Sequence, residues 1–228
     1  MFDLSPKAMT EKTMRGLIKV WTDFESRLSD IPIIDKLERG KFRTDDYKIW
    51  LLNHRQQVVE GSRWIARAAA SVNDDYLEQR STFMQHAVTE HRDYQMLEQH
   101  YVDMGGTLDE IRHAPKNIGS EALHSYMMHQ SSLENPFHLL GAMFIIEGLG
   151  QRKAGEWGAK IRDQLNLTDK EVSFFIYHAE NDEDHMAEFE EILYSGILDI
   201  EGMSDKIIQT AKIVARLYEM QLTEMGNY

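Results

Sequence analysis

Apolar residues along this chain recur at the three- and four-residue spacing that places them on one face of a helix, over almost its whole length. Short breaks such as Gly105–Gly106 and Ser195–Gly196 separate these segments. The pattern predicts helices over residues 8–28, 32–41, 44–72, 75–104, 120–131, 137–164, 169–195 and 203–225. Since no internal repeat or linker is visible, we expect a single all-helical domain over residues 1–228.

Composition supports helices and narrows the possible functions. The 228 residues include 4 prolines and 14 glycines, which leaves little room for a turn-rich β fold. A formal net charge of −13 argues against nucleic acid or an anionic membrane surface as a partner. No apolar run reaches the roughly 18 residues of a membrane span, and no secretory signal is visible, so we expect a cytoplasmic protein. The absence of cysteine excludes thiolate catalysis and thiolate metal ligation.

The stretch HAENDEDH, residues 178–185, contains two populations of polar side chains on one predicted helix. At about 100° per residue, His178, Asp182 and His185 fall inside the apolar sector of that helix, whereas acidic neighbours such as Glu188 point away from it. Burying a carboxylate between two imidazoles without a partner is costly. The inward row therefore predicts either a bound cation or a hydrogen-bonded buried cluster without metal.

Glu147 is a carboxylate within the apolar face of the predicted helix 137–164. No charged residue precedes it for five positions. A lone glutamate in a core pairs with a basic side chain or binds a metal, and Arg152 and Lys153 are available as partners. Both interpretations of Glu147 remain open at this point.

Glu90 lies on the apolar face of the predicted helix 75–104. His86 and Asp93 share its side, and His91 lies on the opposite flank. Together with Glu147 and the row in residues 178–185, three helices would direct carboxylates and imidazoles at one core. Bundles that hold iron or manganese use this arrangement, because carboxylate oxygen and imidazole nitrogen suit both metals.

Three further residues are candidates for a substrate pocket. His54 lies on the apolar face of the predicted helix 44–72, either as a buried core histidine or as part of a pocket wall. Gln57 lies at the edge of that face and Tyr177 near the edge of the face that carries His178, so either could contact a substrate. Glu60 is predicted to point away from the core.

Glu147, followed by His178-x3-Asp182-x2-His185, resembles the haem-oxygenase-like di-iron oxidases and oxygenases. These share their scaffold with haem oxygenase, thiaminase II and the cofactor-independent oxidase that completes pyrroloquinoline quinone. The resemblance covers nearly the whole chain and implies a bundle of about seven to eight helices. It also implies two Fe(II) ions per chain, with Mn possible, that use O2 on an amine, an amino acid or a fatty acid. A homodimer is expected on the same ground.

Carried over by position, the resemblance makes metal ligands of His86, Glu90, Asp93, Glu147, His178, Asp182 and His185. The family places a glutamate and a histidine on its first site helix, and here the histidine position falls on Asp93. We expect one metal held by Glu147, His178 and Asp182, and a second held by Glu90 and Asp93 with His185 or His86. His91 is a substitute ligand if that helix is rotated.

Two alternatives remain. The first is a metal-free oxidase in which the histidines act as acid–base groups. The second is a non-catalytic protein that binds a metal or a small molecule. The chain departs from thiaminase II in having no cysteine, and from haem oxygenase in having its first histidine only at His54.

Overall fold

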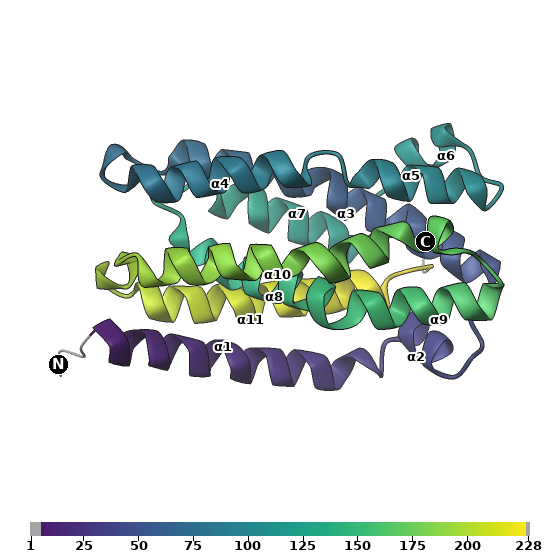
Figure 1. Ribbon diagram of the computed structural model, residues 1–228, viewed down its shortest axis with the longest axis horizontal. Helices are drawn as coiled ribbons and strands as arrows, with labels where there is room; N and C mark the ends of the chain where they lie inside the picture. The colour runs from purple at the N-terminus through teal and green to yellow at the C-terminus, as the bar shows by residue number, and fades with distance from the viewer. Residues whose placement is uncertain (1–5, 227–228) are drawn as a thin grey trace.

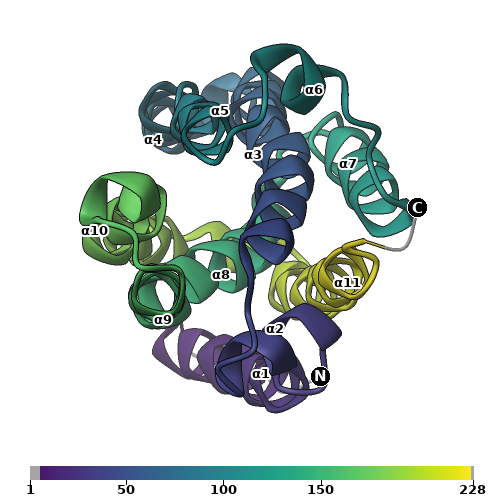
Figure 2. The same ribbon diagram turned by 90° about the vertical axis from the view of Figure 1, so that its right-hand side faces the viewer.

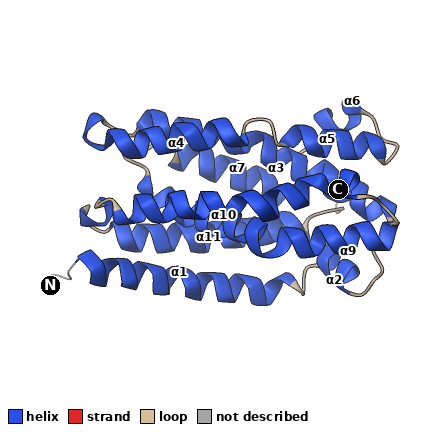
Figure 3. Ribbon diagram, in the orientation of Figure 1, coloured by secondary structure: helices blue, strands red, loops and turns tan. Residues whose placement is uncertain are grey.

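The computed structural model describes residues 6–226, apart from the side chains of residues 6 and 181–184. No strand occurs in this part of the chain (Figure 3), so the predicted all-helical class is confirmed. The α-helices are α1 (Pro6–Leu28), α2 (Pro32–Glu38), α3 (Thr44–Ser71), α4 (Leu77–Glu90), α5 (Tyr94–Asp103), α6 (Leu108–His113), α7 (Ile118–Gln130), α8 (Leu140–Leu149), α9 (Gly155–Leu165), α10 (Ser173–Tyr194) and α11 (Met203–Thr223). Short helical turns are η1 (Asp74–Tyr76), η2 (Phe137–Leu139), η3 (Gly150–Ala154), η4 (Asp169–Val172) and η5 (Ile197–Asp199).

Helix α8 lies inside the bundle. Its sequence, LGAMFIIEGL, is apolar all round, and every residue except Ile146 is buried. A helix of this kind needs cover on all sides. The end-on view shows α8 surrounded by the longer helices, with α4 and α10 on one side and α7 and α11 on the other (Figures 1 and 2). Glu147, near the end of α8, is thereby placed in the interior.

Two glycines allow helices to pack closely around this interior. A Cβ at Gly141 of α8 would collide with the backbone carbonyl of Ile207 in α11. A Cβ at Gly119 of α7 would collide with the backbone of Gln221, also in α11. Both glycines have ordinary helical backbones, so the requirement at these positions is for space and not for an unusual conformation.

The helix predicted over 75–104 is interrupted in the structure, and that prediction is wrong in this respect. Helix α4 ends at Glu90, a turn covers residues 91–93, and α5 begins at Tyr94. A buried carboxylate, Glu98, fixes α5 in its new direction by accepting bonds from Arg55 at 2.9 Å and Arg112 at 2.8 Å. Burial alone would raise the pKa of Glu98, but these two guanidinium groups lower it below its ordinary value.

The segment predicted as a helix over 137–164 is helical but not uniform. It runs through η2, α8, the π-helical turn η3 and α9. The short helix α6 was not predicted, although Thr107 and Glu110 form a capping box at its start, which is a recognisable sequence signal. Within the described residues, no helix combines the length and apolar character needed to cross a bilayer.

We predict that Gly141→Ala destabilises the fold by about 1–3 kcal/mol, because the methyl group has no room against α11. Gly61→Ala in α3 is the matched control. A Cβ there meets nothing within 4 Å, so the replacement should stabilise the helix by about 0.5–1 kcal/mol. Urea unfolding of both variants measures the difference, and equal effects at the two positions would contradict this account of α8 packing.

Candidate metal centre

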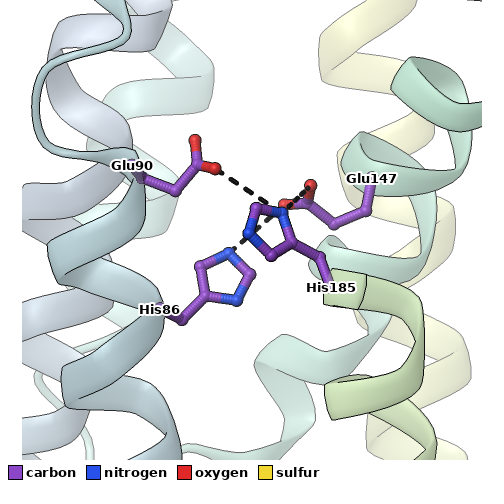
Figure 4. Close-up of side chains that lie close together, drawn as sticks. All are labelled: His86, Glu90, Glu147 and His185. Atoms are coloured by element: carbon purple, nitrogen blue, oxygen red, sulfur yellow. Dashed lines mark hydrogen bonds and ion pairs between the residues drawn. The ribbon is translucent and has the colours of Figure 1, made fainter. Parts of the chain in front are cut away.

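Four side chains from three helices meet beside α8. His86 and Glu90 come from the last turns of α4, Glu147 from α8, and His185 from α10. Each side chain contributes one possible ligand atom, a nitrogen or an oxygen, and these four atoms all lie within 4.8 Å of one another. Figure 4 shows the four side chains converging from opposite sides of the interior. We refer to them as the first ligand group.

Glu147 lies at the centre of the first ligand group. Its Oε2 lies 3.2 Å from His185 Nδ1, and its Oε1 lies 3.6 Å from His86 Nε2. His185 Nδ1 is also 3.5 Å from Glu90 Oε1. The two imidazole rings are stacked, with centroids 4.2 Å apart and planes inclined by 30°. The inner nitrogens of both histidines therefore face the two carboxylates.

The outer nitrogens of the same histidines have partners of their own. His86 Nδ1 lies 2.9 Å from Glu188 Oε2 on α10, and His185 Nε2 lies 3.4 Å from Thr89 Oγ1 on α4. The Thr89 hydroxyl donates to the His86 carbonyl, so its oxygen is free to accept from His185. Metal-bound histidines characteristically donate their second N–H in this way, which fixes the ring and leaves the inner nitrogen for the metal.

A second ligand group adjoins the first. It consists of Glu90, Asp93 and His178, whose nearest ligand atoms also lie within 4.8 Å of one another. Asp93 Oδ2 lies 3.5 Å from His178 Nε2. Asp93 reaches this place because the turn at residues 91–93 redirects the chain before α5 begins. Glu90 belongs to both groups, so its carboxylate lies between them.

Burial and charge shift several pKa values in the metal-free site. Burial opposes protonation of His86, but its contacts with Glu147 and Glu188 prevail and raise its pKa to about 10. Burial, followed by the charge of Glu147, raises the pKa of Glu90 to about 7. Burial likewise raises the pKa of Asp93. Glu147 shifts the other way, because its contacts with His185 and His86 outweigh burial and lower its pKa. Without metal, Glu147 is therefore ionised and His86 carries a proton.

The donor set fits a divalent cation. Three buried atoms, His86 Nε2, Glu90 Oε1 and Asp93 Oδ2, make no hydrogen bond within the described part of the chain. All three belong to the ligand groups and face other ligand atoms. Buried polar atoms are seldom left this way, and a cation would satisfy them together. Imidazole nitrogen with carboxylate oxygen is the mixture that suits iron and manganese.

Helix α9, which follows α8 in the chain, packs closely against α10, the helix that carries His178 and His185. A Cβ at Gly158 would lie 2.7 Å from Phe175 Cβ, and one at Gly155 would lie 3.3 Å from Ala179 Cβ. The π-helical turn η3 begins three residues after Glu147 and shifts the register of the chain before α9. Turns of this kind occur often at functional sites. An irregular turn and a closely packed helix thus lie directly after the helix that carries Glu147.

A cavity lies beside both ligand groups. The centre of a water molecule can occupy about 110 Å³ of this cavity. Glu90, Glu147 and His178 form part of the cavity wall. Most of the remaining lining is apolar, and its aromatic members are Trp50, Trp64, Trp157, Phe174, Phe175 and Tyr218. A mostly apolar cavity with a few convergent polar groups is the usual form of a small-molecule site.

The residues predicted to form a pocket differ in their placement. His54 and Gln57 both line the cavity, whereas Tyr177 is not among the described lining residues and packs its ring on His178. Burial, with a smaller effect of His178, lowers the pKa of His54 to about 3, so its imidazole is neutral at pH 7. Glu60, predicted to point outward, is buried and lines the cavity, because α7 packs on that flank of α3.

Other predictions can also be compared with the structure. His91 is exposed and bonds to the carbonyl of Val88, so it lies outside both ligand groups. The alternative pairing of Glu147 is wrong, since Lys153 binds Glu25 at 2.9 Å and Arg152 lies over the ring of Trp21. The side chain of Asp182 lies outside the described residues.

The predicted division of ligands also differs from the structure. Glu147 was expected to share a metal with His178 and Asp182, but it groups with His86 and His185. Glu188 was expected to face solvent. Its side chain is only 26% exposed and contacts His86. The periodicity of α10 alone could not predict the contact between Glu188 and His86, because that contact depends on where α4 packs.

The fold places the chain in the haem-oxygenase-like class of helical proteins. Residues 62–219 match the family described as iron-containing redox enzymes, and the chain belongs to this family. No curated protein sequence matches the chain.

Several solved structures share the fold. A domain of unknown function with a haem-oxygenase-like fold from Shewanella denitrificans OS217 is 21% identical, with a TM-score of 0.84 over 92% of this chain and 89% of that one. A TenA homologue from Pseudomonas syringae pv. tomato DC3000 is 14% identical, with a TM-score of 0.73 over 95% and 93% of the two chains. A TenA homologue from P. horikoshii OT3 is also 14% identical, with a TM-score of 0.72 over 96% and 98%. At these identities the likeness shows the fold alone.

We predict that the metal-free protein loses stability as the pH rises from about 6.5 towards 10. The pKa of His86 is about 10 in the folded chain against an ordinary value of 6.5, so its protonation stabilises the fold fully below pH 6.5 and ceases to do so as the pH passes 10. Urea unfolding between pH 6 and 9.5, after treatment with a chelator, measures the slope. His86→Gln should flatten it, and an unchanged slope in that variant would contradict the assignment.

Proposed function

We propose that this chain is a non-haem di-iron oxidase or oxygenase that uses O2 on a small organic substrate, as one helical domain over residues 1–228. The observation that carries the proposal is the pair of ligand groups that share Glu90 at the wall of an apolar cavity. Membership in the family of iron-containing redox enzymes supports iron as the metal. Two Fe(II) ions bound there would supply the electrons that O2 accepts.

In this proposal, His86, Glu147 and His185 would hold one metal and Asp93 and His178 would hold the other. Glu90, which belongs to both ligand groups, would be available to either. Asp182 is one helical turn after His178 in the sequence, and we assign it to the second metal on that spacing. Glu90, Asp93, Glu147 and Asp182 carry four negative charges, which balance two divalent cations. Ligation would also remove the proton from His86, while Glu188 retains its bond to the other nitrogen.

The remaining side chains would prepare the cavity for a substrate. The aromatic lining excludes water from the wall that carries the ligands, which strengthens every electrostatic interaction there. His54 is neutral at pH 7 and can donate or accept one hydrogen bond without bringing a charge into the cavity. Gln57 is held by a 2.6 Å bond from Gln221 to its oxygen, which leaves its amide N–H groups to contact a substrate.

We expect two Fe(II) ions per chain under anaerobic conditions. Glu147→Ala should lose the first ion, whereas Asp93→Ala and His178→Ala should lose only the second, because these residues belong to different ligand groups. His91→Ala is the matched control on the same turn as Asp93 and should retain both. Elemental analysis after gel filtration gives the stoichiometry, and far-UV circular dichroism checks the fold. Full iron content in both Glu147→Ala and Asp93→Ala would refute the site.

O2 uptake separates catalysis from the alternatives. With a substrate that fits the cavity, the Fe(II)-loaded protein should consume O2 at least tenfold faster than it does alone, and Glu147→Ala should abolish the increase. An oxygen electrode measures both rates. Rapid O2 uptake that does not depend on the substrate and leaves a stable ferric protein would indicate iron storage. Undiminished turnover after complete removal of iron would indicate the metal-free oxidase.

A further inference from the structure

The wall of the cavity formed by α3 and α7 carries a second set of polar groups. Glu60 of α3 and Ser120 and His124 of α7 line the cavity there. Helix α7 lies on the other side of α3 from α4 and α10, the helices that carry most of the metal ligands (Figure 2). We refer to the lining formed by the metal ligands as the opposite wall. None of these three residues has a part in either ligand group.

The three polar groups have unused capacity for hydrogen bonds. Glu60 and Ser120 are more than nine-tenths buried. Ser120 Oγ and His124 Nδ1 make no hydrogen bond within the described residues, and His124 Nδ1 lies 3.7 Å from Glu60 Oε2. Buried polar atoms without partners inside a cavity commonly meet a ligand or water.

Glu60 is held in its ionised form from the side away from the cavity. Lys116 Nζ donates to Oε1 at 3.2 Å, and Arg63 Nη1 donates to Oε2 at 3.0 Å. Each carboxylate oxygen can accept a further bond, so both remain available to a ligand. The Arg63 side chain is 66% exposed, and solvent therefore screens much of its charge.

The charge of the lining selects among ligands. Glu60, Glu90 and Glu147 are among the described residues that line the cavity, whereas no lysine or arginine is. At the α3–α7 wall, an anionic group would meet Glu60 and, within the described chain, no lining lysine or arginine. Glu60 is the lining carboxylate that belongs to neither ligand group, and its partners Lys116 and Arg63 are not among the described lining residues. A cationic group is therefore favoured at the α3–α7 wall.

Gly61 gives the apolar part of a ligand a place to lie. It is inside α3, next to Glu60, and a Cβ there would meet no atom of the described chain within 4 Å. A glycine inside a helix is less stable than alanine by about 0.5–1 kcal/mol, so open space at this position is retained at a cost in stability. Lining residues of α3 extend from Trp50 to Ile65, which spans about 22 Å along the helix axis.

We propose that the cavity binds a primary amine with an apolar body. The ammonium donates its three N–H groups to Glu60, Ser120 and His124, and the hydrocarbon part crosses Gly61 towards the metal-ligand wall. A primary ammonium has three donors and no acceptor, which matches three groups that can all accept. This inference rests on the proposed function only for the role of the opposite wall, and it narrows the substrate from amines, amino acids or fatty acids to amines without a carboxylate.

Calorimetric titration at pH 7 with octylamine, octanoate and octan-1-ol tests the proposal, because the three probes share a chain and differ in their polar group. The protein is used both with two equivalents of Mn(II) and after metal removal. Octylamine should bind at least tenfold more tightly than either other probe. Glu60→Gln should weaken octylamine at least tenfold and octan-1-ol less than twofold, and Ser120→Ala should weaken octylamine about threefold.

Gly61→Leu provides a second variant that does not disturb the ion pairs of Glu60. Its side chain enters the cavity, so octylamine binding should fall at least tenfold while the melting temperature stays level or rises. Octanoate binding as tight as octylamine, no measurable octylamine binding, or unchanged binding in Glu60→Gln would each overturn the proposal. Loss of binding in Glu147→Gln without loss in Glu60→Gln would also overturn it, since the amine would then lie at the other wall.

The outcomes separate this inference from the proposed function. Octylamine binding that depends on Glu60 in a protein that binds no Mn(II) would leave the amine site standing and remove the di-iron centre. If the protein binds two Mn(II) ions but binds the three probes equally tightly whatever their charge, the metal centre would stand and the amine site would be removed.

Discussion

The structure depends on one buried carboxylate. Glu147 lies inside a helix that is otherwise apolar, and an ionised carboxylate in such a place is stable only with charged or hydrogen-bonded partners. Those partners are His86 and His185, which come from α4 and α10 on the far side of the interior. Helices α4, α8 and α10 must therefore keep a fixed spacing. Gly155 and Gly158 let α9 pack closely on α10, and the turn after Glu90 lets the chain change direction after α4.

Each histidine of the first ligand group is held from behind as well as from the front. Glu188 contacts the outer nitrogen of His86, and Thr89 that of His185. These outer contacts orient both rings so that their other nitrogens face Glu147 and Glu90. Among the inner atoms, His185 Nδ1 and Glu147 Oε2 lie within hydrogen-bond distance at 3.2 Å, whereas His86 Nε2 and Glu90 Oε1 form no hydrogen bond within the described residues. Within this part of the chain, two buried polar atoms of the first ligand group therefore lack a partner that a cation would supply.

Much of the fold follows from periodicity, because a bundle buries one face of each helix and that face is visible in the sequence. The candidate ligands were found in the same way, as polar residues on apolar faces. Three features were not predictable from one helix at a time. Residues 91–93 contain neither glycine nor proline, so nothing local marks the turn. Glu60 and Glu188 lie on flanks that a single helical period assigns to solvent, and each is covered by a neighbouring helix.

The departures from regular helix coincide with the candidate centre. The turn at 91–93 lies between Glu90 and Asp93, and the π-helical turn η3 begins three residues after Glu147. A regular helix through 75–104 would keep Glu90 and Asp93 at a fixed angle on one cylinder, whereas the turn allows their carboxylates to approach His185 and His178 separately. Local structure is generally consistent with sequence except where function requires otherwise. Both interruptions of regular helix lie next to carboxylates of the candidate centre. Independently of ligand chemistry, this coincidence indicates that the irregular backbone serves to position these carboxylates.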